Sequence, residues 1–141
     1  MINDFFRPND LENFHNEILS FQWTLLVDKA SFEIKGFFKL NQASNWNEFR
    51  LALSYFGGLQ QNFVYADKQV NIGLHPAASL PIRQRTGQRI LPGHDGSADW
   101  LGLRRTLELP FSYNPAEGWL GFANNALEEP GMGTIAGYFA P

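Results

Sequence analysis

The sequence predicts an α+β fold, with a helix and a β-hairpin in its first half and a loop-rich second half. Three observations predict this arrangement. Apolar residues recur at helical spacing behind a capping box near residue 45, two strand-like runs flank a short turn near residue 67, and prolines and glycines are spread through the chain from residue 77 onward. Because no linker, repeat or low-complexity tract interrupts residues 1–141, we expect one folded piece.

The N-terminal part is expected to contain a helix, a strand and a second helix. Asp10 is a suitable N-cap for the apolar residues at helical spacing that follow it, which predicts a helix over residues 11–20. The run FQWTLLV at residues 21–27 is typical of a strand. Residues 31–40 fit neither period cleanly, and Gly36 weakens a helix by roughly 1 kcal/mol relative to alanine. A helix is nevertheless favoured there.

The best-defined elements lie in the middle of the chain. Asn45 and Glu48 have the spacing of a capping box, and apolar residues follow at i, i+3, i+7 and i+10, so a helix is predicted over residues 46–56. A glycine pair is expected to end this helix. Residues 62–66 and 70–74 then flank three polar residues, and this pattern predicts a β-hairpin.

The charge and hydropathy of the chain narrow the classes of partner. The net charge is −3 with a pI near 5.5, and no basic run is longer than Arg104-Arg105, so nucleic acid is not expected as a partner. No apolar stretch approaches the ~20 residues that a membrane-spanning helix requires, so no membrane partner is expected. The N-terminus, MINDFFRPND, has neither the basic nor the apolar region of an export signal.

No metal site is expected in this chain. Cysteine is absent, which excludes disulfides and thiol catalysis. The histidines are too far apart in sequence to form a common ligand motif and are interpreted as ordinary surface or half-buried imidazoles: His15, His75 and His94. Asp95 and Asp99 lie close together but lack the fuller ligand set of a calcium loop.

Two polar pairs near the C-terminus are candidates for chemistry. Glu128-Glu129 could act as an acid and a base, but adjacent residues in a loop rich in proline and glycine rarely converge on one bond, so a solvated turn is favoured. Asn124-Asn125 follow an apolar, strand-like run at residues 118–123 that would carry an amide into the interior. Spacing alone favours a turn-forming pair of asparagines, and a functional role stays open.

Several segments resemble the penicillin acylase family in the same order along the chain. Residues 41–92 resemble a helix with W-x-E-F followed by Q-N-x-x-Y-A-D, N-I-G and P-x-R. The segment PGHDGSADWLGL then resembles P-G-x-D-G-x-x-x-W-x-G, and LELPFSYNPAEGWLGFANN resembles E-L-P-x-x-x-N-P-x-x-G-x-x-x-A-N-N. Phe21 to Thr24 resembles an earlier R-W-T. The chain is therefore identified as a member of this family, a single partial domain over residues 1–141 that is an internal segment of the β-chain.

The resemblance implies a fold and a reaction. Penicillin, cephalosporin and acyl-homoserine lactone acylases of this family are similar in having an αββα sandwich and a precursor that cleaves itself, so that the β-chain begins with a serine. The serine hydroxyl attacks a linear amide while its own α-amine, of ordinary pKa near 8, accepts the proton. The first asparagine of A-N-N supplies an oxyanion-hole N–H, and this position is Asn124. Asn124 is the predicted catalytic residue.

The resemblance also implies partners and location. The substrate is expected to be a small-molecule N-acyl amide, and the protein partners are the remaining α- and β-chain segments of the acylase. No cofactor is required; calcium is possible in the full-length enzyme, with ligands outside this chain. The full-length enzyme is expected to be periplasmic or secreted. Asn125, Gln61, Asn62 and Asp67 are expected to organise the backbone around the site. Trp100 and Trp119 could line an acyl pocket, but packing in the core is favoured.

The chain departs from the family pattern in ways that bear on activity. The nucleophilic serine is not in this chain, since none of its serines has the motif of a processing junction, so the isolated chain is expected to be inactive. Val70 stands where the family often has glycine in the A-D-x-x-G-N turn, and Phe21-Gln22 replaces a basic residue before Trp23. The alternative reading is a non-catalytic binding module or a truncated inactive remnant.

Overall fold

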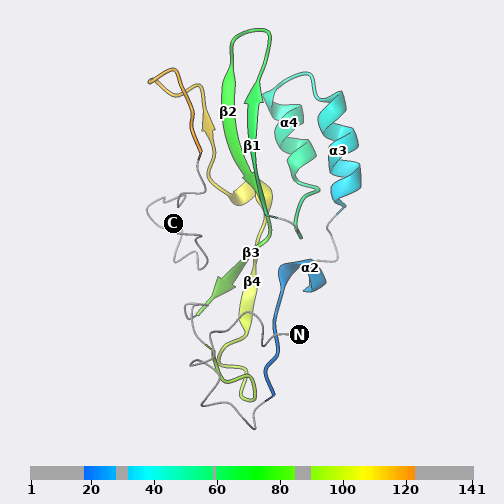
Figure 1. The fold of residues 1–141 in the computed structure, drawn as a ribbon, viewed down its shortest axis with the longest axis vertical. Coiled ribbons are helices and arrows are strands. Elements are labelled where there is room, and N and C mark those ends of the chain that lie inside the picture. The colour runs from blue at the N-terminus through cyan, green and yellow to red at the C-terminus, as the bar shows by residue number, and fades with distance from the viewer. Residues whose placement is uncertain (1–17, 28–31, 59, 85–89, 123–141) are drawn as a thin grey trace.

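The computed structural model describes residues 18–27, 32–58, 60–84 and 90–122. Their elements, in chain order, are α2 (Thr24–Val27), α3 (Glu33–Gln42), α4 (Trp46–Leu53), β1 (Gln61–Ala66), β2 (Ile72–Ala77), β3 (Leu80–Arg83), β4 (Trp100–Arg104), the 3-10 helix η2 (Thr106–Glu108) and β5 (Ser112–Tyr113). Helices α3 and α4 lie beside the β1–β2 hairpin, and β3 and β4 form a second ribbon beyond it (Figure 1). In these described ranges, no helix has the length and apolar character needed to cross a bilayer.

The predicted hairpin is confirmed, with a longer turn than expected. β1 and β2 pair antiparallel from Gln61↔Ala77 to Ala66↔Ile72, and β5 pairs with the other edge of β2. The turn therefore covers residues 67–71, and Val70 belongs to it rather than to the second strand. The φ angle of Val70 is 67°, in the left-handed region that a β-branched side chain disfavours.

Helix α4 confirms the capping box and shows how it is built. The Oδ1 atom of Asn45 accepts a hydrogen bond from the Glu48 N–H at 3.0 Å. The Glu48 carboxylate accepts in return from the Ser44 N–H at 2.8 Å, one residue earlier than in the standard motif. The α-helix ends at Leu53, three residues before the predicted end, and the N–H of Phe56 bonds to the Leu53 carbonyl in a tighter turn.

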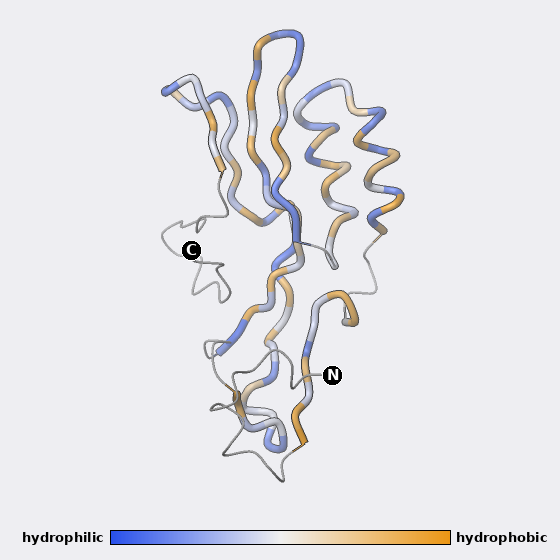
Figure 2. Tube along the Cα trace, in the orientation of Figure 1, coloured by the Kyte–Doolittle hydropathy of each residue, from blue (hydrophilic) through white to orange (hydrophobic). Residues whose placement is uncertain are grey.

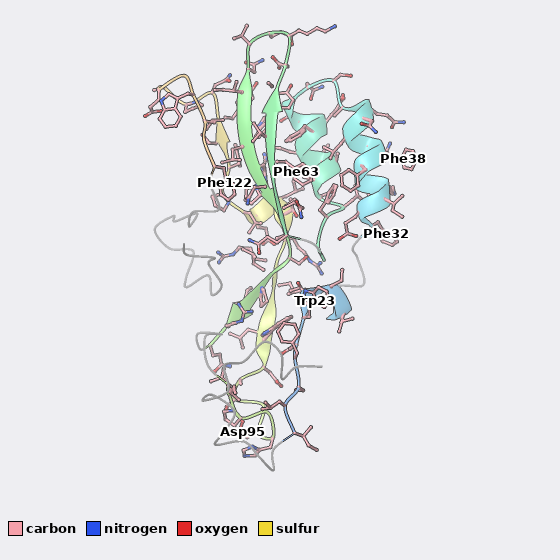
Figure 3. The ribbon with its side chains drawn as sticks, viewed as in Figure 1. Trp23, Phe32, Phe38, Phe63, Asp95 and Phe122 are labelled. Atoms are coloured by element: carbon pink, nitrogen blue, oxygen red, sulfur yellow. The ribbon has the colours of Figure 1, made fainter. Side chains whose placement is uncertain are left out.

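The core lies between α4 and the hairpin. Four apolar residues at the predicted helical spacing pack there with two residues from the sheet: Trp46, Phe49, Leu53 and Phe56 with Tyr65 and Ala77. Phe63 packs against the same core between the hairpin and α4 (Figure 3). Glycines make the close contacts, because an added Cβ at Gly73 would lie 2.4 Å from the Trp46 ring.

Helix α3 is confirmed where the sequence was ambiguous, and packing explains its glycine. Gly36 is buried against Phe56, and an added Cβ would come within 2.4 Å of that ring. The residue that weakens the helix locally is therefore the one that lets α3 approach the core. Hydrophobic and hydrophilic residues alternate along α3 (Figure 2). Some of its apolar side chains are exposed, among them Ile34 at 77%, and Phe38 points away from the core (Figure 3).

Two strand predictions are wrong. Residues 21–27 contain the short helix α2 instead of a strand, and the N–H of Leu26 bonds locally to the Trp23 carbonyl. An apolar run of this length fits either structure, and no partner strand pairs with it in the ranges that the structure describes. Residues 118–122 are not a strand, and Gly118 has a φ of 73° that breaks extended geometry. The predicted helix over 11–20 is absent from 18–20, and residues 11–17 lie outside the described part.

Candidate functional site

The predicted catalytic residue lies outside the described residues. The same holds for the neighbouring Asn125 and for Glu128-Glu129, because the description ends at residue 122. The surroundings of Asn124 are therefore not described, and its role stays a prediction. The family-like segments around the hairpin turn and after β5 are described, and side chains from both form one hydrogen-bond network.

Asp67 is the centre of this network. Its Oδ1 accepts from the backbone N–H groups of Gln69 and Asn71, both at 2.9 Å. Its Oδ2 accepts from the Asn71 side-chain amide at 2.8 Å and from the Tyr65 hydroxyl at 2.9 Å. Four donors thus satisfy one carboxylate and close the hairpin turn. The expectation that Asp67 organises the surrounding backbone is confirmed.

These hydrogen bonds shift the pKa values of both partners. The side-chain hydrogen bond from Asn71 is the largest influence that lowers the pKa of the Asp67 carboxyl. Burial, followed by the hydrogen bond to Asp67, raises the pKa of Tyr65 to about 12. The carboxylate therefore stays charged and the phenol stays neutral at physiological pH, which keeps the direction of their hydrogen bond fixed.

Asn71 and Asn114 extend the hydrogen-bond network from the hairpin turn to the residue that follows β5. The Asn71 Oδ1 accepts from the Asn114 Nδ2 at 2.8 Å, and the Asn114 Oδ1 accepts from the Ile72 N–H at 2.9 Å. The Asn114 N–H also donates to the Ile72 carbonyl at 2.9 Å. Sequence reasoning missed these residues, although both are asparagines of the N-I-G and N-P motifs, and that coincidence is the signal that could have found them.

His75 is a buried polar residue beneath α4. Its Nδ1 lies 2.7 Å from the Pro76 carbonyl, so Nδ1 carries the proton, and its Nε2 has no partner within the described residues. The ring stacks on Phe111 at 5.5 Å, and the Arg50 guanidinium lies 4.0 Å from the centre of the Phe111 ring. Burial, helped by the positive charge of Arg50, lowers the pKa of His75. It is a neutral histidine that is 0% exposed, so the expectation of a surface or half-buried imidazole is wrong for His75.

Thr106 holds the beginning of η2 against the ends of α4 and β2. Its hydroxyl donates toward the Phe56 carbonyl at 2.9 Å, with the Ala78 carbonyl at 3.2 Å, and accepts from the Ala78 N–H at 3.1 Å. The side chain is 2% exposed. The adjacent Arg105 donates to the Ser79 hydroxyl at 3.1 Å. These hydrogen bonds of Thr106 and Arg105, which we call the seam, join the first half of the chain to the loop-rich second half.

The remaining candidates serve local structure or lie at the surface. Asp95 accepts from the Ser97 N–H at 2.9 Å in a turn where Gly96 has a φ of 71° (Figure 3). In the described part of the chain, no group of three or more His, Cys, Asp or Glu residues could hold a metal ion. Trp100 is half-buried beside Arg83, whereas Trp119 is 69% exposed, so the expectation that it packs in the core is wrong for this chain.

Gln61 and Asn62 begin β1 at the edge of the hairpin. The side chain of Gln61 is exposed, whereas Asn62 is half-buried and its Oδ1 has no partner within the described residues. Among the residues that the structure describes, neither side chain forms a hydrogen bond that organises the neighbouring backbone in the way that Asp67 does. Their expected role as backbone organisers therefore stays a prediction.

Comparison with known proteins identifies the family. The model of the penicillin amidase family matches residues 1–141. The chain belongs to this family. Among penicillin amidase relatives, the acyl-homoserine lactone acylase QuiP of Pseudomonas fluorescens is 33% identical over 117 residues, which are 82% of this chain and 14% of that protein. QuiP of Pseudomonas aeruginosa is 33% identical over 110 residues, covering 77% of this chain and 13% of that protein.

A solved structure supports the same assignment. A thermostable penicillin G acylase from Alcaligenes faecalis matches with a TM-score of 0.62 and 33% identity, covering 81% of this chain and 21% of that chain. The mixed helix and sheet arrangement thus resembles part of a penicillin acylase fold. The chain spans 13% to 14% of the length of these two curated relatives. It is an acylase-type segment, and the activity of a whole protein is a matter for proposal.

Proposed function

We propose that this chain is an internal β-chain segment of an N-terminal-nucleophile amidohydrolase that cleaves linear amides of small N-acyl substrates. The observation that carries the proposal is the family match over residues 1–141, together with relatives that are named as acyl-homoserine lactone acylases. The short share of those relatives that it covers supports a nucleophilic serine outside this chain. On its own, the chain is expected to be inactive.

Asn124 is the proposed oxyanion donor. The serine hydroxyl oxygen attacks the amide carbonyl carbon, its proton passes to the α-amine of the same residue, and that proton then leaves with the departing amine. Water hydrolyses the acyl-enzyme by the reverse path. An asparagine amide suits the oxyanion because it remains neutral and oriented while negative charge develops on the carbonyl oxygen. Removing one such donor typically costs roughly 2.7 to 4 kcal/mol in the barrier.

The apolar surface of the chain supports a segment rather than an independent binding module. Phe32, Ile34 and Phe38 are exposed on and beside α3, and Leu51 is exposed on α4. Large apolar side chains that stay exposed in such numbers on one pair of helices are typical of an interface. We propose that the remaining α- and β-chain segments of the acylase cover it, and that the complete molecule forms an αββα sandwich in which α3 and α4 belong to one helical layer.

Further features of the full-length enzyme are proposed from the family. It would mature by cleavage of an inactive precursor and would be periplasmic or secreted. No cofactor is needed for the chemistry above, and any calcium would be held by ligands outside this chain. Nucleic acid and membrane partners are not proposed, given the acidic net charge and the lack of long apolar stretches.

Hydrolysis of N-acyl amides tests the proposal. Phenylacetyl amides and long-chain acyl-homoserine lactones would be assayed with residues 1–141 alone and with the full-length polypeptide that contains them. We expect turnover only by the full-length protein, and a loss of about two to three orders of magnitude in kcat for Asn124→Ala. A full-length protein that is inert on every amide would redirect the search to ligand binding, and an unimpaired Asn124→Ala variant would remove that residue from the mechanism.

A further inference from the structure

His75 is a buried titratable side chain with an acceptor atom that the described residues leave unused. The side chain is 0% exposed, and its Nδ1 donates to the Pro76 carbonyl at 2.7 Å. The Nε2 atom therefore carries a lone pair, and within the described residues it has no hydrogen-bond partner. A proton added at Nε2 would create a charged N–H group that is buried without an acceptor, which is a costly arrangement in a protein interior.

The charge nearest to this ring has the wrong sign to compensate such a proton. The His75 ring stacks on the Phe111 ring with 5.5 Å between the centroids and 6° between the planes. The Arg50 guanidinium lies 4.0 Å from the centre of the same Phe111 ring. Protonation of His75 would therefore bring a second cation to one phenyl ring, in an environment where water does not screen the repulsion.

Other titratable groups around the ring are engaged elsewhere. They lie on each of the surrounding elements: Glu48 on α4, Tyr65 on β1, Tyr113 on β5 and Glu108 on η2. Both carboxylates accept from backbone N–H groups at the start of their own helices, and both phenols are neutral in acid. Asp67, in the hairpin turn, is bonded to four donors of its own. Within the described residues, no anion is thus bonded to His75.

A short segment covers one side of the ring. Residues 110–113, which we call the flap, place Phe111 on His75 and stack Tyr113 on the Trp46 ring at 4.8 Å. Two residue pairs join β5 to β2, whereas six pairs join β1 to β2. Phe111 itself is 45% exposed. The flap is therefore the part of the surroundings of His75 that can open at the lowest cost.

Both ends of the flap are anchored. Leu109, which precedes it, is 3% exposed. Asn114, which follows it, makes two hydrogen bonds of 2.9 Å with Ile72, one through its backbone N–H and one through its side-chain oxygen, and we call this pair the clip. An opening of the flap is bounded by these anchors and need not spread to α4 or to the β1–β2 hairpin.

We propose that His75 and the flap form an acid-sensitive latch: when Nε2 takes up a proton, residues 110–113 separate from β2 and α4, while the core between α4 and the hairpin stays folded. Departure of Phe111 gives water access to the charged ring and separates it from Arg50. Because burial lowers the pKa of His75 in the closed state, the latch is fully stable above the ordinary pKa near 6.5 and weakens as the pH falls below it. The latch does not depend on acylase activity.

Hydrogen–deuterium exchange of the full-length polypeptide that contains residues 1–141 tests the latch. Exchange would be read by mass spectrometry from about pH 7.5 to about pH 5, and protection would be expressed relative to an unstructured chain at each pH. The flap should keep constant protection above pH 6.5 and lose up to about tenfold per pH unit below it, the limit for one proton. Fragments from α4 and β1 should keep their protection throughout.

Substitutions identify the group that responds. His75→Phe keeps a ring that can stack on Phe111 but has no site for a proton, so the protection of the flap should become independent of pH in this window. His94→Phe replaces an exposed histidine and is the matched control, which should leave the response unchanged. Should His75→Phe fail to fold, His75→Asn, which keeps a donor for the Pro76 carbonyl and does not titrate, takes its place.

Three results would overturn the latch. The first is a flap whose protection does not change below pH 6.5, and the second is a fall that persists when His75 is replaced. The third is a parallel loss of protection in α4 and β1, because acid would then unfold the core as a whole. Failure of both His75 variants to fold also overturns it, since the residue would then be required by the core itself.

Discussion

The two halves of the described chain depend to different extents on apolar packing and on single polar side chains. From α3 to β2, aromatic and aliphatic side chains spaced by helix and strand periods pack into one core. From β4 to residue 122 the chain adds fewer apolar contacts to this core, such as Phe111 on His75. Single polar side chains also bond there to distant backbone groups, as Thr106 does to Phe56 and Asn114 to Ile72. A packed core spreads its stability over many contacts, whereas a polar clip depends on one side chain. The two halves should therefore respond differently to small changes.

The largest expected effect tests the core of the first half. Leu53 is 0% exposed on α4, whereas Leu51 on the same helix is 59% exposed. Leu53→Ala should lower the free energy of unfolding by about 2–5 kcal/mol, because it leaves a cavity among aromatic rings. Leu51→Ala is the matched control and should stay within about 0.5 kcal/mol. Chemical denaturation monitored by tryptophan fluorescence would measure both, and equal losses would contradict the assigned core.

The next effect tests the seam that joins the halves. Thr106→Val keeps the shape of the side chain but leaves the Ala78 N–H and the Phe56 carbonyl without their partner. We expect a loss of about 1–3 kcal/mol in the free energy of unfolding, the usual cost of unsatisfied buried polar groups. Thr106→Ser retains the hydroxyl and should recover most of the loss. If valine and serine were equivalent in the same denaturation experiment, packing rather than hydrogen bonding would hold the seam.

Sequence predicted the first half well because periodicity is a property of many residues at once. The capping box at Asn45, the helical spacing to Phe56 and the hairpin around Asp67 were all predicted correctly, although the helix is shorter and the turn longer than expected. The second half was predicted only as loop-rich, because hydropathy periodicity gives no sign that Thr106 or Asn114 will form hydrogen bonds with residues far away in the sequence. The strand prediction for residues 21–27 was wrong for a related reason. An apolar run can form a helix or a strand, and the sequence does not show whether a partner strand is present to pair with it.

The candidate site could be predicted only in part. Asp67 was expected to organise its surroundings because it stands in a recognisable family turn, and its four donors confirm this. Asn71 and Asn114 were missed because their amides are 43 positions apart in the chain and meet only in the folded sheet. Asn124 remains a prediction from the A-N-N motif.

A smaller effect is expected at the hairpin turn, where the chain departs from its family. Val70 has a φ of 67° and stands where the resemblance to the family leads us to expect a glycine. Val70→Gly removes a left-handed strain of roughly 1–2 kcal/mol, offset by the roughly 0.5–1 kcal/mol that a glycine's greater freedom costs on folding. We expect a net gain of up to about 1 kcal/mol in the free energy of unfolding. Val64→Gly, within β1, should destabilise instead, and a gain there would contradict the register of the hairpin.

The smallest effect at neutral pH concerns His75, whose protonation should weaken the packing of the first half. Burial holds its folded pKa below the ordinary value near 6.5, so the unfolded chain binds a proton more readily than the folded chain. Stability from the neutral ring is fully present above pH 6.5 and should be lost as the pH falls from 6.5 toward the folded pKa. Denaturation at a series of pH values should show this decline, and His75→Phe should remove it in that window. His94→Phe, at an exposed position, should retain it. If stability declined with acid equally in His75→Phe, another group would be responsible. If the decline disappeared in His75→Phe, acid would weaken the first half by protonating the His75 ring beside Arg50 and Phe111.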